Sequence, residues 1–419
     1  MTGRRTVPPL STRRQFLRVA AGAATAALVA ACARAADRSA GPPTASTGGT
    51  SPSGLPPSVG PTTGPTAGPS ASPTPGPPLR EIIAGLLVIG FRGLTAATAG
   101  PITKSIAADG LGGVILFDRD RSGGPRNVAS PAQLERLTAD LQGLAGGRTL
   151  LIAIDQEGGR VNRLGTGYGF PAMTSEADIG QRADDAAARA WATVIAGTLA
   201  SVGVNLNLAP VVDVDVNARN PAIGALDRSF SGDPAVVERM ARIEIEAHRA
   251  AGVATSLKHF PGLGSATVNT DFGVADVTDT WRRRELRPFE GLIGSGDVDT
   301  IMAANLVNRD LDPDYPASLS SAIVTDLLRG ELGWDGVVIT DDLHAGAITD
   351  AFGADEAIAR AIEAGCDLLL FANQQTFDAD LASTTIDTIE GLVASGRIGV
   401  DRLLESRTRI ERLVAGLGR

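Results

Sequence analysis

The sequence predicts an α/β fold: a single (β/α)8 barrel of the TIM type, preceded by a signal segment and a disordered linker. From about Leu79 to Arg419, eight short apolar runs alternate with amphipathic stretches of helical spacing. The runs are apolar throughout, which is typical of parallel strands covered on both faces. Polar side chains follow five of the runs, as expected for a barrel whose strand ends converge on one face.

The expected strands are short and are separated by helical patterns. In chain order they span residues 86–89, 113–117, 150–154, 204–208, 254–257, 300–303, 337–340 and 367–371. The amphipathic stretches between them include residues 131–144, 186–202, 235–251, 320–332 and 355–364. A doubly wound open sheet is the alternative for such an alternation. No strand is followed by Gly-x-Gly-x-x-Gly or a Walker loop, so we favour the barrel.

Residues 1–31 have the features of an export signal. Thr12 to Leu17 resembles a twin-arginine signal. The apolar run from Val19 to Ala31 is too short for a bilayer, which needs about 20 residues. Val29-Ala30-Ala31-Cys32 resembles the bacterial lipobox, whose cysteine is lipidated and becomes the N-terminus. We therefore expect an exported protein, anchored by a lipid on Cys32 at the extracytoplasmic face of the cell membrane. An ordinary cleaved signal is the alternative.

Residues 32–78 form the expected linker, and residues 79–419 form the expected barrel with its C-terminal helix. The stretch from Ser39 to Pro78 has no charged residue and is dominated by Pro, Gly, Ser and Thr. Such a composition buries too little apolar surface to offset the entropy of an ordered chain. The linker would hold the barrel away from the membrane surface.

Charge and composition exclude several classes of partner. The net charge is −9 and no basic stripe occurs, which argues against a nucleic-acid partner. The three histidines and two cysteines form no cluster with metal-ligand spacing, so we expect neither a metal nor a cofactor. After processing at Cys32, Cys366 would be the one remaining thiol, so no intramolecular disulfide is expected.

The residues that follow the expected strands are mainly Asp, Asn, Lys, His and Arg. Such a ring of directional donors and acceptors suits a polyhydroxylated substrate. In strand order the ring comprises Asp155 to Arg163, Asp213 and Asp215, Lys258 and His259, Asn305, and Asp341 and Asp342.

Four motifs in this order resemble glycoside hydrolase family 3, and within it the bacterial β-N-acetylglucosaminidases that trim peptidoglycan fragments. The resemblance covers about Leu79 to Val393. It rests on Asp-Gln-Glu-Gly-Gly-Arg-Val-Asn-Arg at 155–163, Asn-Pro-Ala-Ile-Gly at 220–224 with Arg-Ser-Phe at 228–230, Lys-His-Phe-Pro-Gly at 258–262, and Gly-Val-Val-Ile-Thr-Asp-Asp-Leu at 336–343.

The resemblance implies a role for each matching residue. Asp341 matches the nucleophile that forms a glycosyl-enzyme in a retaining glycosidase; on its own, an Asp in this place would be read as a helix cap. Asp342 is the better cap, and we expect neighbouring cations to keep Asp341 ionised. Asp155, Arg163, Arg228, Lys258 and His259 match the contacts to the sugar. Arg160 is expected to pack against its loop through an ion pair with Glu157.

The chain departs from the family pattern where the acid/base is expected. The family continues after Lys-His-Phe-Pro-Gly with an Asp-Ser-His triplet, whereas this chain has Asn269-Thr270-Asp271. Three interpretations stay open: Asp271 is the acid/base, His344 replaces it, or the acid is lost.

Two functional hypotheses follow. The first is a lipid-anchored retaining β-N-acetylglucosaminidase that acts on GlcNAc-containing muropeptides or small glycans. The second is a catalytically weakened barrel that binds cell-wall sugars.

Overall fold

The computed structural model describes residues 76–417. The predicted signal segment, Cys32 and all but the last three residues of the predicted linker lie outside this range. Among the described residues, no helix is long and apolar enough to cross a membrane.

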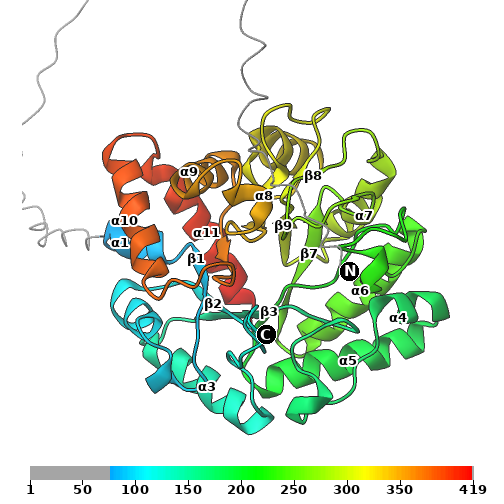
Figure 1. The fold of residues 1–419 in the computed structure, drawn as a ribbon, viewed down its shortest axis with the longest axis horizontal. Coiled ribbons are helices and arrows are strands. Elements are labelled where there is room, and N and C mark those ends of the chain that lie inside the picture. Colours follow the sequence, from blue (N-terminus) through cyan, green and yellow to red (C-terminus); the bar gives the residue numbers. More distant parts are fainter. Residues whose placement is uncertain (1–75, 418–419) are drawn as a thin grey trace, which may run out of the picture. The chain divides into compact units, whose positions relative to one another are not determined.

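Eight parallel strands form the centre of the molecule (Figure 1). They are β1 (Leu87–Gly90), β2 (Gly113–Leu116), β3 (Leu151–Ile154), β6 (Leu206–Asn207), β7 (Ala254–Phe260), β9 (Thr300–Ala303), β11 (Val337–Thr340) and β12 (Leu369–Phe371). Their order is β11-β9-β7-β6-β3-β2-β1-β12, and a parallel bridge from Ile339 to Leu368 joins the two ends of the sheet. This closure confirms the predicted barrel and rules out the open-sheet alternative.

Helices surround the strands, so the apolar faces of both layers are buried (Figure 1). The α-helices are α1 (Leu79–Ala84), α2 (Ile102–Lys104), α3 (Pro131–Leu144), α4 (Glu176–Arg182), α5 (Asp185–Ser201), α6 (Pro234–Ala250), α7 (Arg287–Ser295), α8 (Gly346–Thr349), α9 (Ala354–Ala364), α10 (Leu381–Ala394) and α11 (Val400–Gly416). Two segments have π-helical hydrogen bonding, Ser105–Asp109 and Ala322–Glu331. Short 3₁₀ turns occupy Ala96–Thr98, Thr166–Tyr168, Gly224–Leu226, Arg283–Leu286 and Ala317–Leu319. All five predicted amphipathic stretches are therefore helical.

Side-chain caps begin three of the long helices, α3, α5 and α6. The hydroxyl of Ser130 accepts a hydrogen bond from the backbone of Gln133 at 3.2 Å and caps α3. The carboxylates of Asp184 and Asp233 cap α5 and α6 in the same way. These caps satisfy backbone N–H groups that have no partner within the helix.

Two pairs of short strands lie outside the barrel sheet. β4 (Gln156–Gly158) pairs antiparallel with β5 (Val161–Asn162), within the segment that follows β3. β8 (Ala275–Asp276) pairs parallel with β10 (Leu306–Val307). β7 also runs further than predicted, so Lys258 and His259 belong to the strand instead of following it.

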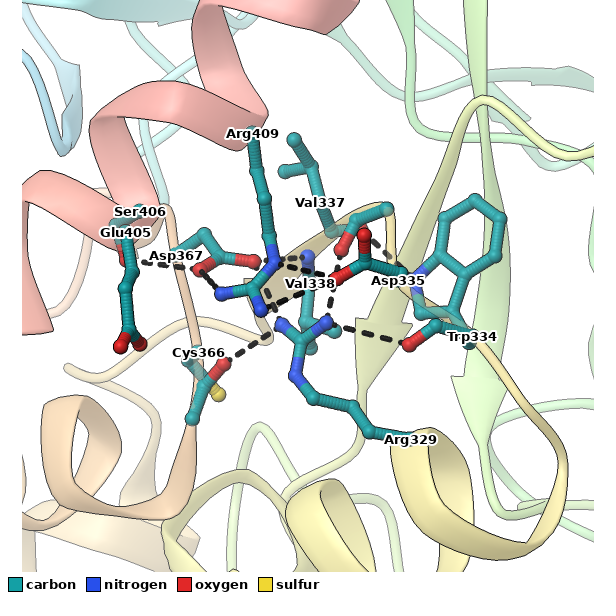
Figure 2. A network of polar contacts seen from close by, with 12 residues as sticks. Arg329, Trp334, Asp335, Val337, Val338, Cys366, Asp367, Glu405, Ser406 and Arg409 are labelled. Carbon is teal, nitrogen blue, oxygen red and sulfur yellow. Dashed lines mark hydrogen bonds and ion pairs between the residues drawn. The ribbon is translucent and has the colours of Figure 1, made fainter. Parts of the chain in front are cut away.

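A buried carboxylate ties the C-terminal helix to the start of the last two strands (Figure 2). Asp367 is fully buried, and it accepts hydrogen bonds from Arg329 at 2.7 Å and from Ser406 of α11 at 2.8 Å. Arg409 of α11 lies 3.3 Å from the same carboxylate, and the backbone N–H of Val338 donates to it at 3.0 Å. The barrel is thus braced at the end of the strands opposite to the polar ring.

Candidate active site

A cavity of about 210 Å³ opens at the carboxyl ends of the barrel strands. It is the place where a (β/α)8 barrel positions its active site. All seven residues predicted to act on substrate line it, namely Asp155, Arg163, Arg228, Lys258, His259, Asp271 and Asp341. A larger cavity of about 680 Å³ lies at the opposite end of the strands, and none of these residues lines it. We therefore assign the site to the smaller cavity.

The floor of the cavity is a network of ion pairs centred on the buried Lys258 and Glu157. The Lys258 ammonium lies 2.7 Å from Asp155 Oδ1 and 2.6 Å from Glu157 Oε1. Arg228 donates two hydrogen bonds to Glu157, at 2.7 and 2.8 Å. Arg163 lies 3.9 Å from Asp155. Because each buried charge has an opposite charge beside it, the network meets the condition under which charges can be buried at all.

These pairings keep the floor ionised. Burial by itself would raise the pKa of Asp155, but the charges of Lys258 and Arg163 outweigh it and lower that pKa below its ordinary value. Burial would lower the pKa of Lys258, but Asp155 and Glu157 outweigh it and raise that pKa. The floor therefore offers a carboxylate acceptor beside cationic donors, which is what recognition of sugar hydroxyls and amides needs.

Glu157 supports the site through its ion pairs, and its predicted pairing with Arg160 is wrong. The expected partner of Glu157 was Arg160, but Arg160 is exposed and lies 3.6 Å from Asp227 instead. Glu157 holds Arg228 and Lys258, as described above. The spacing of Asp155 and Glu157 is the signal in the sequence, because residues i and i+2 of an extended segment point to the same side.

His259 is oriented by a carboxylate that was recognised only as a strand-end residue. Asp213 is fully buried, and its Oδ2 lies 2.6 Å from His259 Nδ1. The same carboxylate accepts the backbone N–H groups of His259 and Leu263, at 3.2 and 2.6 Å. With Nδ1 engaged, Nε2 is the ring nitrogen left for other partners, and it lies 3.5 Å from Arg228 Nη2.

Asp341 follows β11 and is held by the backbone. Its N–H donates to Ala303 O at 2.9 Å, and its Oδ1 accepts from the N–H of Asp342 at 2.8 Å. Burial raises the pKa of Asp341 and the charge of Asp271 adds to the rise, while His259 acts in the opposite direction. The shift is thus opposite to the one expected from neighbouring cations, because burial is the largest cause.

Asp342 turns the chain after the strand and does not cap a helix. Its Oδ1 accepts the N–H groups of His344 at 3.0 Å and Ala372 at 2.9 Å, whereas α8 begins only at Gly346. Burial raises the pKa of Asp342 to about 7. The cap prediction for Asp342 was therefore wrong, since its hydrogen bonds join the loops after β11 and β12.

The triplet Asn269-Thr270-Asp271, which departs from the family pattern, forms a turn that lines the cavity. The side chain of Asn269 accepts the N–H of Asp271 at 2.9 Å, which closes a short turn. Thr270 O and Asp271 O accept the N–H groups of Ala347 and Gly346, at 3.2 and 3.3 Å. The turn therefore rests on the segment that follows Asp341, and the Asp271 side chain lines the same cavity as Asp341.

His344 is placed differently from Asp271. Its ring packs edge-on against Phe371, with centroids 5.2 Å apart, and it is not among the residues that line the cavity. Of the two candidates for the acid, the structure brings only Asp271 to the cavity of Asp341.

The chain's similarity to known proteins agrees with this site. Residues 79–413 match the family described as glycosyl hydrolase family 3 N terminal domain. A β-hexosaminidase of Xylella fastidiosa is 35% identical over 333 residues, which cover 76% of this chain and 94% of that protein. The structure of a glycoside hydrolase family 3 β-N-acetylglucosaminidase from Paenibacillus is 35% identical with a TM-score of 0.74, over 81% of this chain and 63% of that one. The structure of a β-N-acetylhexosaminidase from Beutenbergia cavernae is 32% identical with a TM-score of 0.73, over 81% of this chain and 99% of that one.

Proposed function

This chain belongs to glycoside hydrolase family 3, and we propose that it is a retaining β-N-acetylhexosaminidase. It removes terminal β-linked N-acetylglucosamine from peptidoglycan fragments or small glycans, through a glycosyl-enzyme on Asp341. The observation that carries the proposal is the single cavity in which Asp341 and Asp271 meet the ion-paired floor. The likeness to β-hexosaminidases over most of their length supports the choice of sugar.

The proposed reaction has two steps, in which Asp341 is the nucleophile and Asp271 is the acid and then the base. A carboxylate oxygen of Asp341 bonds to the anomeric carbon while the bond from that carbon to the aglycone oxygen breaks. The aglycone oxygen keeps the bonding pair and takes the proton of the Asp271 carboxyl. A water molecule then gives a proton to the Asp271 carboxylate, attacks the anomeric carbon and releases Asp341.

The floor has a separate role in this scheme. Asp155 and Lys258 present an acceptor and a donor to the sugar, Arg163 and Arg228 supply further donors, and His259 offers its Nε2 as a further contact. Because these groups are held by each other and by Glu157 and Asp213, the sugar meets a preorganised surface.

The first test uses aryl glycosides. The purified protein is expected to release 4-nitrophenol from the β-N-acetylglucosaminide and much less from the β-glucoside. Asp341→Asn is expected to abolish this turnover, and undiminished activity in that variant would rule out Asp341 as the nucleophile. Failure of the wild-type protein to turn over either glycoside would favour the sugar-binding alternative.

The second test separates the acid from the nucleophile. Asp271→Ala is expected to slow hydrolysis of a natural disaccharide far more than hydrolysis of an activated aryl glycoside, since only the poor leaving group needs the proton. Equal losses on both substrates would contradict the assignment of Asp271.

The location of the enzyme is a further part of the proposal. We propose export and a lipid anchor on Cys32 at the extracytoplasmic face of the membrane, on the basis of the twin-arginine-like segment and the lipobox-like Val29 to Cys32. Cys32→Ala is expected to move the protein from the membrane fraction to the soluble fraction of its host. Retention of that variant in the membrane would contradict the anchor.

A further inference from the structure

Arg121 differs from the other cations that line the cavity. Lys258, Arg228 and Arg163 each have a carboxylate within 4.0 Å, as described above. Within residues 76–417, Arg121 forms no such pair; its polar partner is the amide oxygen of Gln375, to which its Nη1 donates. The charge of Arg121 is therefore not used to balance the floor.

Instead, Arg121 joins three loops that come from different strands. It lies in the loop after β2, and Gln375 lies in the loop after β12. The guanidinium carbon of Arg121 lies 4.9 Å from the centroid of the Phe272 ring, in the loop after β7. Gln375 in turn donates its side-chain N–H to Asp271 O at 2.9 Å. Arg121 thus contacts the Asp271 turn both directly and through Gln375.

Arg121 lies in a tight turn, residues 120–124, that is held in place by Asp120. The N–H of Asp120 donates to Gly124 O at 2.9 Å, and the N–H of Gly123 donates back to Asp120 O at 2.8 Å. The Asp120 carboxylate lies 3.1 Å from the buried Arg126 and 2.8 Å from Arg92. A tight turn with a paired carboxylate at its base presents Arg121 from a fixed position.

The Asp271 turn, in contrast, has few other ties. The Phe272 side chain is 70% exposed, so burial of its ring does not hold the turn. The backbone bonds from Gly346 and Ala347 to the turn are long, at 3.3 and 3.2 Å. The contact of Arg121 with the Phe272 ring and the hydrogen bond from Gln375 therefore contribute much of the interaction that holds the turn in place.

We propose that Arg121 is a positioning residue that holds the Asp271 turn over Asp341, through Phe272 and Gln375. The proposal rests on the role of Asp271 given under the proposed function. Arg121 itself transfers no proton. It limits the positions of the Asp271 carboxyl, so that the carboxyl is within reach when the aglycone oxygen needs a proton.

The first measurement does not depend on activity. In hydrogen–deuterium exchange, the peptide that covers residues 262–274 includes the N–H groups of Asp271, Phe272 and Gly273, all of which donate to Asn269. Arg121→Ala is expected to increase their exchange rate by about tenfold, on the scale of the two contacts that are lost. Arg136→Ala, which removes an exposed arginine of α3, is the matched control and should leave that peptide unchanged. Unchanged exchange in Arg121→Ala would overturn the proposal whether or not the protein is an active glycosidase.

The second measurement tests positioning of the acid. Arg121→Ala is expected to lower kcat for aryl N-acetylglucosaminides with poor leaving groups by about tenfold, and to change kcat for the most activated ones by less than about twofold. Phe272→Ala should give the same pattern, and the double variant should lose little more, because both residues belong to one contact. Faster exchange together with equal losses for all leaving groups would also overturn the proposal. A wild-type protein without turnover would instead contradict the proposed function.

Discussion

Two buried glutamates behind the cavity floor are expected to make stability fall as the pH rises. Glu176 and Glu244 are 1% and 0% exposed. Three of their four carboxyl oxygens, Glu176 Oε2 and both oxygens of Glu244, have no hydrogen-bond partner among the described residues. The fourth, Glu176 Oε1, accepts the N–H of Val211 at 3.1 Å. Ionised carboxylates in such a place would lack the solvation that they have in water.

Burial raises the pKa of both groups well above the ordinary value, and the charge of Glu244 further raises the pKa of Glu176. Above the pKa of the unfolded chain, the folded state therefore binds protons that the unfolded state has released. Each group's contribution to stability is complete below the unfolded pKa, and it is lost as the pH rises toward the folded pKa. Within that window each group changes the free energy of unfolding by up to about 1.4 kcal/mol per pH unit.

The perturbation that tests this is Glu244→Gln, which keeps the side-chain shape and cannot ionise. The loss of a nearby charge lowers the pKa of Glu176 as well. We therefore expect the variant to gain stability relative to the wild type by up to about 1.4 kcal/mol per pH unit for each affected group, above about pH 5.

The assay is urea unfolding, followed by circular dichroism, at several values between pH 5 and pH 8. The matched control is Glu246→Gln, because Glu246 lies on the same helix and is exposed. Parallel stability curves for Glu244→Gln and the wild type would refute the reasoning, since they would mean that Glu244 binds no more protons in the folded chain than in the unfolded one.

Three further predictions concern the cavity floor, the Asp367 network at the opposite end of the strands, and the start of the loop after β7. Lys258→Met removes the buried cation that Asp155 and the buried Glu157 share and is expected to lower the free energy of unfolding by about 3–5 kcal/mol in urea titrations; a loss below about 1 kcal/mol would contradict the ion-pair network. Asp367→Asn leaves its arginine partners underpaired (Figure 2) and should lower Tm, while kcat at 25 °C stays close to wild type because the site is at the other end of the strands; an unchanged Tm would argue against the brace. In Gly264→Ala, a Cβ would lie 1.8 Å from Val214 O, so the loop after β7 must shift. The value of kcat on a natural disaccharide should then fall by at least about tenfold. A wild-type kcat would show that the start of this loop does not position Asp271.

The barrel was predictable because its pattern is repeated and local. Each strand is a short run of apolar residues, and three of the long helices, α3, α5 and α6, begin at a side chain that accepts backbone N–H groups. The extension of β7 through Lys258 and His259 was not predictable in this way. Two polar residues in a strand become compatible with burial only when Asp155 and Asp213 lie beside them.

That the site residues line one cavity was predictable, but the way they pair within it was not. All seven predicted residues line one cavity, because strand ends in a barrel converge. Which cation meets which carboxylate depends on loop geometry, so Glu157 was assigned to Arg160 when it pairs with Arg228. The direction of the pKa shift at Asp341 was missed for a related reason, since the depth of burial cannot be read from neighbouring residue types.

The floor and the Asp271 turn differ in how strongly the fold constrains them, and the departure from the family pattern lies in the turn. In the floor, Lys258 pairs with both Asp155 and Glu157, so replacing any one of them deprives a charge in the network of one of its partners. Such a loss costs about 3–5 kcal/mol, a large share of the stability of a folded domain. The Asp271 turn is tied mainly by its backbone and by Arg121, and its side chains face the cavity or solvent. In the proposed mechanism, a change of residue in the turn would alter proton delivery at little cost to folding, whereas a change in the floor would impair both sugar binding and folding. The proposed sugar-binding residues are thus constrained by the fold as well as by the substrate, whereas the fold constrains the proposed acid less.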